Sequence, residues 1–123
     1  MKNIVIQMQK CQVKRIVALG GYGVLPTEDG SMLMDQNDFP PDLLPVNEEH
    51  KQAYGYLAIS NLDWTFVCVA HIVDKDANAN VVTTTFETAL TRDQASSGNT
   101  ALFMVEATAR NLYMNQRVGI RGV

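Results

Sequence analysis

The sequence predicts an α/β protein with a short, mainly parallel sheet. Residues 14–20 and 63–70 are short, almost continuous apolar runs, the pattern of parallel strands that are covered on both faces. A helix-forming stretch separates them, so strand, helix and strand make one βαβ unit. RVGIRGV, residues 117–123, is typical of a last strand.

Composition and charge describe one globular domain, residues 1–123. The chain is 46% apolar and 19% charged with a net charge of -3, which argues against disorder and against a nucleic-acid partner. No apolar run approaches the roughly 20 residues that span a bilayer, and MKNIVIQMQK lacks a signal-peptide core. We therefore expect a soluble cytoplasmic protein with no membrane partner.

Cys11 and Cys68 should be reduced, packed thiols; a reactive thiol is the alternative.

The first half of the chain begins with a predicted amphipathic helix over residues 2–11, which buries Ile4, Met8 and Cys11. The strand at residues 14–20 follows. Four prolines then mark residues 24–45 as a long loop, which we expect to run over the edge of the sheet.

The second half adds a middle helix, an edge strand and a late helix. Asn47, followed by two acids, predicts a helix start, and the helix should end near Ser60. Its buried residues are expected to be Tyr54, Leu57 and Ala58. DKDANAN, residues 74–80, is a polar turn, and VVTTTFE, residues 81–87, alternates like an edge strand or hairpin arm. Residues 98–110 predict a helix with Leu102, Val105 and Ala109 on one face, which Phe103 and Met104 broaden.

A glycine cluster ends the first strand, at Gly20, Gly21 and Gly23. The dinucleotide-binding pattern G-x-G-x-x-G, started at Gly21, places Pro26 where the third glycine belongs. A phosphate loop must lead directly into a helix, whereas this turn leads into a proline-rich loop with two acids. The glycines are therefore predicted to turn the chain sharply and not to bind phosphate.

Ligand-binding residues are expected where parallel strands end, because their carboxyl ends line the crevice of an open α/β sheet. This places Gly20, Gly21, Tyr22 and His71 together as candidate ligand contacts. The alternative for His71 is a hydrogen bond to loop backbone. No catalytic residue is predicted, since no serine lies in a G-x-S-x-G context, and His50 with His71 is too small a set for a metal site.

Three blocks carry a family resemblance: VKRIVALGG, HKQAYGYLAISNLDWTFVCVAHIVD and RDQASSGNTALFMVEA. In this order they resemble the NAD(P)H-binding proteins of the atypical short-chain dehydrogenase superfamily, which includes flavin and biliverdin-IXβ reductases. Ser60 to Val73 is the most specific part. The resemblance implies a truncated, half Rossmann-like three-layer fold, because the family's first strand and glycine-rich loop would lie before residue 1.

Several family positions do not match. The family's serine would fall at Gly20 or Gly21, and its tyrosine and lysine near Lys51 and Gly55. Asn99 stands near the usual aspartate. Tyr54 and Tyr56 lie on the same predicted helix but lack the lysine that lowers a tyrosine pKa.

These departures lead to an expected function. The chain should have no autonomous redox activity and no cofactor of its own, and should act as a homo-oligomeric assembly or small-ligand-binding module whose exposed strand edge is completed by a second copy. The alternative is an NAD(P)H-dependent oxidoreductase, with NADP bound only if another subunit completes the site. A third possibility is that Met1 is internal to a longer protein.

Overall fold

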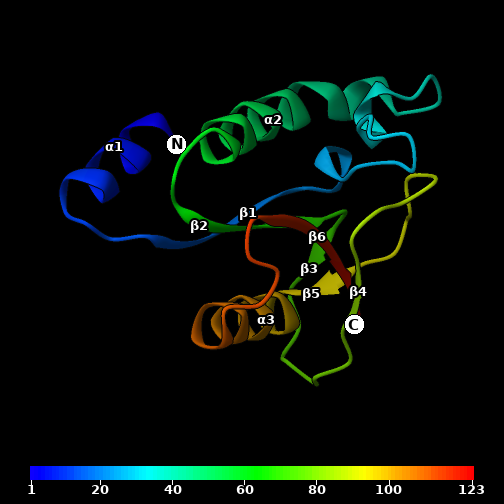
Figure 1. The fold of residues 1–123 in the computed structure, drawn as a ribbon. Coiled ribbons are helices and arrows are strands. Elements are labelled where there is room, and N and C mark those ends of the chain that lie inside the picture. The colour runs from blue at the N-terminus through cyan, green and yellow to red at the C-terminus, as the bar shows by residue number, and fades with distance from the viewer.

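A four-stranded sheet forms the middle layer of the computed structural model, which describes residues 1–123 (Figure 1). Its strands lie in the order β1-β2-β6-β4, and the first three are parallel while β4 is antiparallel. Their bounds are β1 Arg15–Gly21, β2 Asp63–Val69, β6 Gln116–Arg121 and β4 Val82–Thr84. Two short strands, β3 (Ile72–Val73) and β5 (Ala95–Ser96), pair separately. The prediction of a short, mainly parallel sheet is confirmed.

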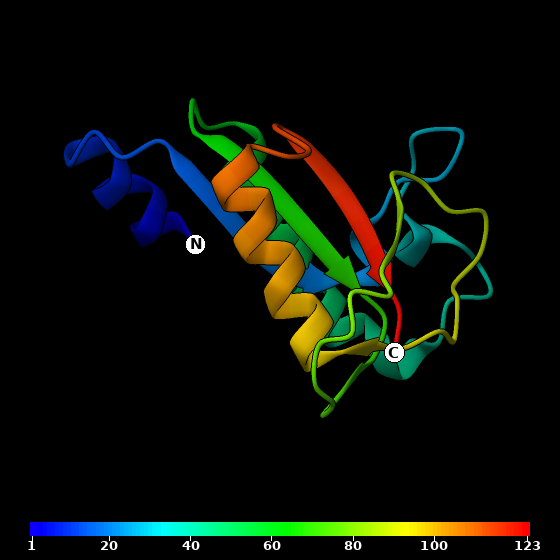
Figure 2. The same cartoon turned by 90° about the horizontal axis from the view of Figure 1, so that it is seen from below.

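Helices cover both faces of this sheet. They are α1 (Lys2–Lys10), α2 (Leu44–Ala58) and α3 (Ser97–Arg110). Figures 1 and 2 show α2 over one face and α3 over the other, while α1 lies beyond the β1 side of the sheet and contacts α2. One apolar core lies on the α2 side and includes Leu57 and Phe66, and a second on the α3 side includes Phe103 and Val118.

Continuous apolar runs became strands because both of their faces are buried. In β2 every residue from Trp64 to Val69 is buried, and β2 lies between β1 and β6. β1 contributes Ile16 and Ala18 to the α2-side core and Val17 to the α3-side core. The expected strands at 14–20 and 63–70 are thus confirmed within one residue at each end.

The middle helix begins earlier than its polar start signal predicts. α2 starts at Leu44, with Pro45 in its first turn, and not at Asn47. Asn47 lies inside the helix and is buried, and its side-chain oxygen accepts a hydrogen bond from the Gly23 amide. Leu57 is buried as expected, whereas Ala58 is exposed.

The long proline-bearing loop begins on a face of the sheet and continues beyond the carboxyl ends of the strands (Figures 1 and 2), whereas the sequence predicts a course over the edge. It folds into three 3-10 turns, Tyr22–Val24, Leu33–Asp35 and Pro41–Leu43. Leu25 and Tyr22 sit over Gly119 of β6, where an added Cβ would lie 2.6 Å from Leu25 Cδ1. No helix covers this part of the α2 face, so the apolar residues of the loop cover it.

Two predicted helix faces are only partly correct. α1 buries only Val5, and Ile4 is half exposed; Cys11, expected to be packed, is exposed, while Cys68 is buried. α3 starts where the Ser96 hydroxyl accepts a hydrogen bond from the Asn99 amide at 3.0 Å. Its buried residues are Asn99, Thr100, Phe103 and Ala107. Phe103, which broadens the expected face, is buried, whereas Leu102, Val105 and Ala109 are exposed.

The two edges of the sheet differ. β4 is the short antiparallel edge strand, which confirms the edge-strand prediction for residues 81–87 over a shorter span. β1 is the other edge, and its outer backbone groups have no strand partner in the chain. No helix has the length and apolar character that a membrane crossing requires.

Candidate functional site

The carboxyl ends of β1 and β2 lie side by side, as the crevice argument predicts. Gly20 is opposite Cys68 and Gly21 opposite Val69 in the parallel register. The chain then leaves β1 through the glycine turn, residues 20–23, and leaves β2 through Ala70 and His71. Two of the sequence-predicted regions are thus brought together at one end of the sheet.

Backbone amides of the glycine turn are occupied by side chains of α2. The Gly21 amide donates to His50 Nδ1 at 2.9 Å, and the Gly23 amide donates to Asn47 Oδ1 at 3.1 Å. The Asn47 amide nitrogen in turn donates to the Leu43 carbonyl at 2.9 Å. A diphosphate needs free amides, and these two are not free.

Close approach of α2 explains why these positions are glycines. A Cβ at Gly21 would overlap Asn47 Oδ1 and lie 3.0 Å from His50 Nδ1. A Cβ at Gly20 would overlap the ring of Phe66. The turn is therefore a packing device, in agreement with the prediction that it turns the chain.

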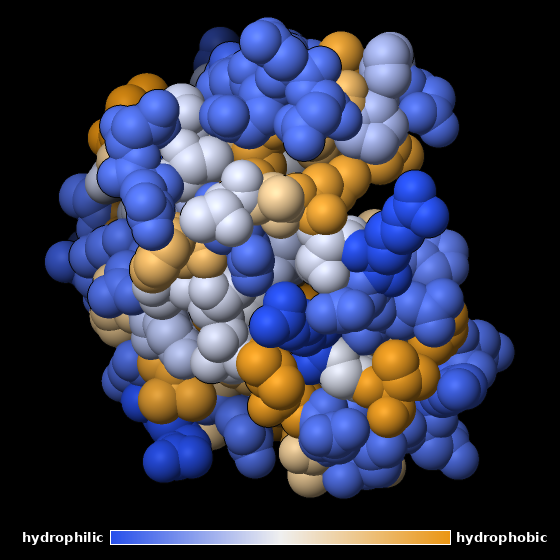
Figure 3. All heavy atoms as spheres, turned by 90° about the vertical axis from the view of Figure 1, so that its right-hand side faces the viewer, coloured by the Kyte–Doolittle hydropathy of each residue, from blue (hydrophilic) through white to orange (hydrophobic).

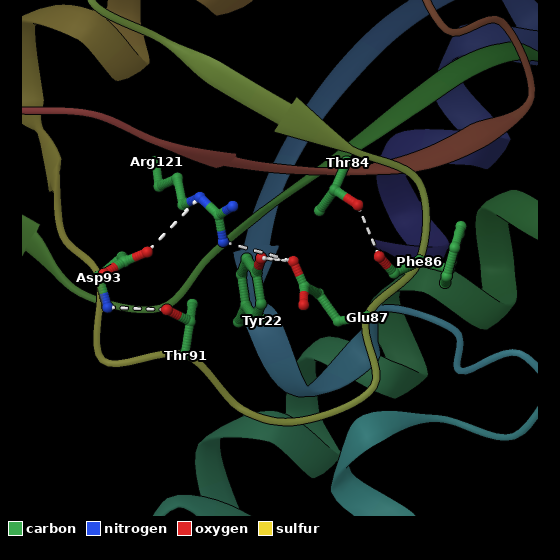
Figure 4. A network of polar contacts seen from close by, with 7 residues as sticks. All are labelled: Tyr22, Thr84, Phe86, Glu87, Thr91, Asp93 and Arg121. Carbon is green, nitrogen blue, oxygen red and sulfur yellow. Dashed lines mark hydrogen bonds and ion pairs between the residues drawn. The ribbon is translucent and has the colours of Figure 1, made fainter.

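Tyr22 is buried in a polar network beside this turn (Figure 4). Its hydroxyl donates to Glu87 Oε1 at 3.0 Å, and the same oxygen lies 3.5 Å from Arg121 Nη1. Arg121 Nε also pairs with Asp93 at 3.5 Å. Burial, and then the hydrogen bond to Glu87, raise the pKa of Tyr22 well above its ordinary value. Tyr22 therefore stays neutral, and its hydrogen bond to Glu87 connects the end of β1 to the loop at residues 85–93.

His71 lines a pocket of about 340 Å³ at the end of β2. The other lining residues are Pro40, Asp42, Leu43, Ala70, Leu90, Thr91 and Arg92. The His71 side chain makes no hydrogen bond within the protein, so the alternative of a bond to loop backbone is wrong. The His71 backbone carbonyl accepts a hydrogen bond from the Ala95 amide at 2.9 Å. Figure 3 views the molecule from this loop-bearing end, where apolar and strongly hydrophilic side chains alternate.

The four candidate ligand contacts therefore separate. Gly20 and Gly21 support packing, Tyr22 lies in a buried network, and His71 lines the pocket. Sequence reasoning missed Asn47 as the partner of the glycine turn and Arg92 as a pocket cation. Neither had a usable signal, because both depend on which distant segments meet. No group of three or more His, Cys, Asp or Glu side chains converges as a metal site would require.

A family model described as NAD(P)H-binding matches residues 1–111. The chain belongs to the NAD(P)H-binding family. The family implies a dinucleotide, and its diphosphate would need the free amides that the glycine turn lacks. The residues of this turn do not fit that group.

Solved structures share the fold of this NAD(P)H-binding chain. A Burkholderia pseudomallei protein assigned as exported has 27% identity and a TM-score of 0.84, and the match covers 98% of this chain and 61% of that one. SP1627 of Streptococcus pneumoniae TIGR4, assigned as an NADH-flavin reductase, has 20% identity and a TM-score of 0.76, with coverage of 100% and 67%. ChuY of Escherichia coli O157:H7, an anaerobillin reductase, has 13% identity and a TM-score of 0.75, with coverage of 98% and 55%.

These matches establish a Rossmann-like NAD(P)-binding fold, as the resemblance implied. The chain spans about three fifths of the length of these neighbours. No curated protein matches the sequence.

Proposed function

We propose that residues 1–123 act as a small-ligand-binding and assembly module of the NAD(P)H-binding family, without autonomous redox activity. One observation carries the proposal: the amides of Gly21 and Gly23 are held by His50 and Asn47. The glycine turn therefore offers no cradle to a diphosphate, which is the main source of dinucleotide affinity in this fold.

The pocket beside His71 is the proposed ligand site. Its volume of about 340 Å³ lies within the range of small-molecule sites, and it combines apolar walls with three ionisable side chains, Asp42, His71 and Arg92. Arg92 forms no ion pair within the protein, so its guanidinium is available to an anionic group.

The test separates cofactor binding from ligand binding. The purified chain, titrated with NADH and NADPH in a calorimeter, should give no saturable heat. FMN, chosen because one structural neighbour is assigned as an NADH-flavin reductase, should shift the backbone amide of His71 saturably in NMR spectra. Arg92→Ala should weaken this response at least tenfold, while the matched control Arg110→Ala, on exposed α3, should not. Saturable dinucleotide binding, or an FMN response unchanged in Arg92→Ala, would contradict the proposal.

We also propose that a second copy of the chain covers the open edge of β1. The edge carries unpaired backbone groups, and Leu19 on β1 is 43% exposed. An open edge that carries an exposed apolar side chain favours association with another chain.

A second candidate function is an NAD(P)H-dependent reductase whose cofactor site is completed by another polypeptide or a further segment. It is favoured by the neighbours, of whose length this chain spans about three fifths. Reductase activity that appears only on adding a second chain, together with no dinucleotide binding by this chain alone, would select it.

We place the protein in the cytoplasm. Cys11 and Cys68 are both free thiols, and an exposed free thiol such as Cys11 is typical of a reducing compartment. Fractionation of cells that express the protein tests this, since recovery from an oxidising compartment would contradict it.

A further inference from the structure

A groove on the α2 face of the sheet is separate from the pocket beside His71. It has a volume of about 350 Å³ and lies between α2, the first residues of β2 and β6, and two loops. We call it the Arg117 groove; its lining includes Tyr54, Trp64, Asn115 and Arg117. None of its eight lining residues is acidic, so Arg117 supplies its only charge.

Arg117 is held in a fixed position but is not neutralised. Its guanidinium carbon lies 4.5 Å from the centre of the Tyr54 ring, and its Nη1 donates to the Val24 carbonyl at 2.9 Å. Its remaining N–H groups make no hydrogen bond within the protein and are not buried. Arg121, four residues further along the same face of β6, pairs with both Glu87 and Asp93, whereas Arg117 pairs with no carboxylate.

The aromatic wall of the groove is also rigid. Tyr54 meets Trp64 edge-on with ring centres 5.6 Å apart and meets Phe66 in the same way at 5.8 Å. Trp64 and Phe66 both contact the Tyr54 ring from the core side. The Arg117 guanidinium and this ring therefore keep their relative positions before any ligand arrives. The Tyr54 hydroxyl makes no hydrogen bond in the protein and is a further free donor.

We propose that the Arg117 groove binds a small aromatic carboxylate. A fixed guanidinium with free N–H groups matches the two oxygens of a carboxylate, and bonds to an ionised acceptor are roughly twice as strong as neutral ones. Pre-positioned donors also reduce the entropy lost on binding. The volume suits a ligand of one or two rings, which the apolar walls formed by Trp64, Pro26 and Ala58 would hold.

Trp64 provides the measurement, since it is the only tryptophan in the chain. In NMR spectra of the full chain, 2-naphthoate should shift the single indole N–H peak saturably. The neutral isostere 2-naphthamide should bind at least tenfold more weakly, and acetate at equal concentration should not shift the peak. Equal affinity for acid and amide, or an unmoved indole peak, would overturn the proposal.

Variants assign the site. Arg117→Gln should weaken 2-naphthoate binding at least tenfold, while Arg110→Gln, a charge loss on the opposite side of the sheet, should leave it unchanged. His71→Ala should also leave it unchanged, because the two pockets share no lining residue. If Arg117→Gln disturbs folding, the acid and amide comparison in the unaltered chain still decides. Unaltered binding by folded Arg117→Gln would overturn the assignment.

Discussion

Asn47 and His50 lie almost one turn apart on α2, and both accept hydrogen bonds from the glycine turn. The turn can approach them only because Gly21 and Gly23 lack side chains. At the scale of single residues, therefore, glycine was a correct signal of a sharp turn. The partner of the Gly23 amide was not predictable. Asn47 has the sequence signature of a helix start, but it lies inside the helix and accepts the hydrogen bond from there.

Gly21→Ala should lower the free energy of unfolding by about 1 to 3 kcal/mol, because the added methyl group overlaps Asn47 Oδ1. Gly55→Ala is the matched control: Gly55 lies inside α2 with nothing near an added Cβ. It should raise the free energy of unfolding by about 0.5 to 1 kcal/mol. Urea unfolding followed by circular dichroism measures both, and equal effects of the two changes would refute the packing account.

The two cysteines should differ sharply in reactivity. Burial raises the pKa of the Cys68 thiol far above its ordinary value, so its thiolate is not populated at pH 8. Cys11 is exposed. Ellman's reagent should therefore modify one thiol rapidly in the native protein and two in urea. Rapid modification of both thiols in the native state would show that the core opens around Cys68.

At the scale of elements, the residue 85–93 loop is held to the sheet by a few polar contacts. Glu87 accepts from the buried Tyr22 hydroxyl and pairs with Arg121, while its amide donates to the Pro26 carbonyl at 3.0 Å. The loop has little apolar burial, and Phe86 is 48% exposed. Leu90 and Arg92 belong to this loop and form one wall of the His71 pocket. The position of this wall thus depends on Glu87.

Glu87→Ala should free this loop without unfolding the sheet. Leaving the buried Tyr22 hydroxyl without its acceptor costs about 1 to 3 kcal/mol, so amide exchange at residues 85–93 should quicken about fivefold or more. Amides of β2 should keep their protection. Thr88→Ala, an exposed position with no hydrogen bond, is the control. Hydrogen exchange read by mass spectrometry distinguishes local opening from global destabilisation, and unchanged exchange in the loop would remove Glu87 from this role.

At the scale of the whole molecule, one edge of the sheet is short and antiparallel and the other is open. β4 ends the sheet on one side, whereas β1 presents a full seven-residue edge on which Leu19 is 43% exposed.

Light scattering at micromolar concentration should give a mass about twice the 13.6 kDa of one chain, or a higher multiple. Leu19→Lys should shift the mass to that of a single chain, because the charge would be placed at the buried edge. Val82→Lys, a comparable exposed change on β4, should not. A monomer in the unaltered protein would refute the proposed homo-oligomer.

Local pattern was sufficient for the class of fold, for β1 and β2 within one residue at each end, and for the turn function of the glycines. These features follow from the burial of both faces of a strand and from the backbone freedom of glycine. Both can be recognised from residues that are neighbours in the sequence. The predicted last strand, residues 117–123, ends two residues beyond β6. Long-range contacts alone decided that Asn47 and His50 occupy the turn amides, that the loop after β1 covers β6, and which face of α3 is buried. Such outcomes depend on which distant surfaces meet. The residues next to Leu102 and Ala107 in the sequence do not indicate that Leu102 is exposed and Ala107 buried.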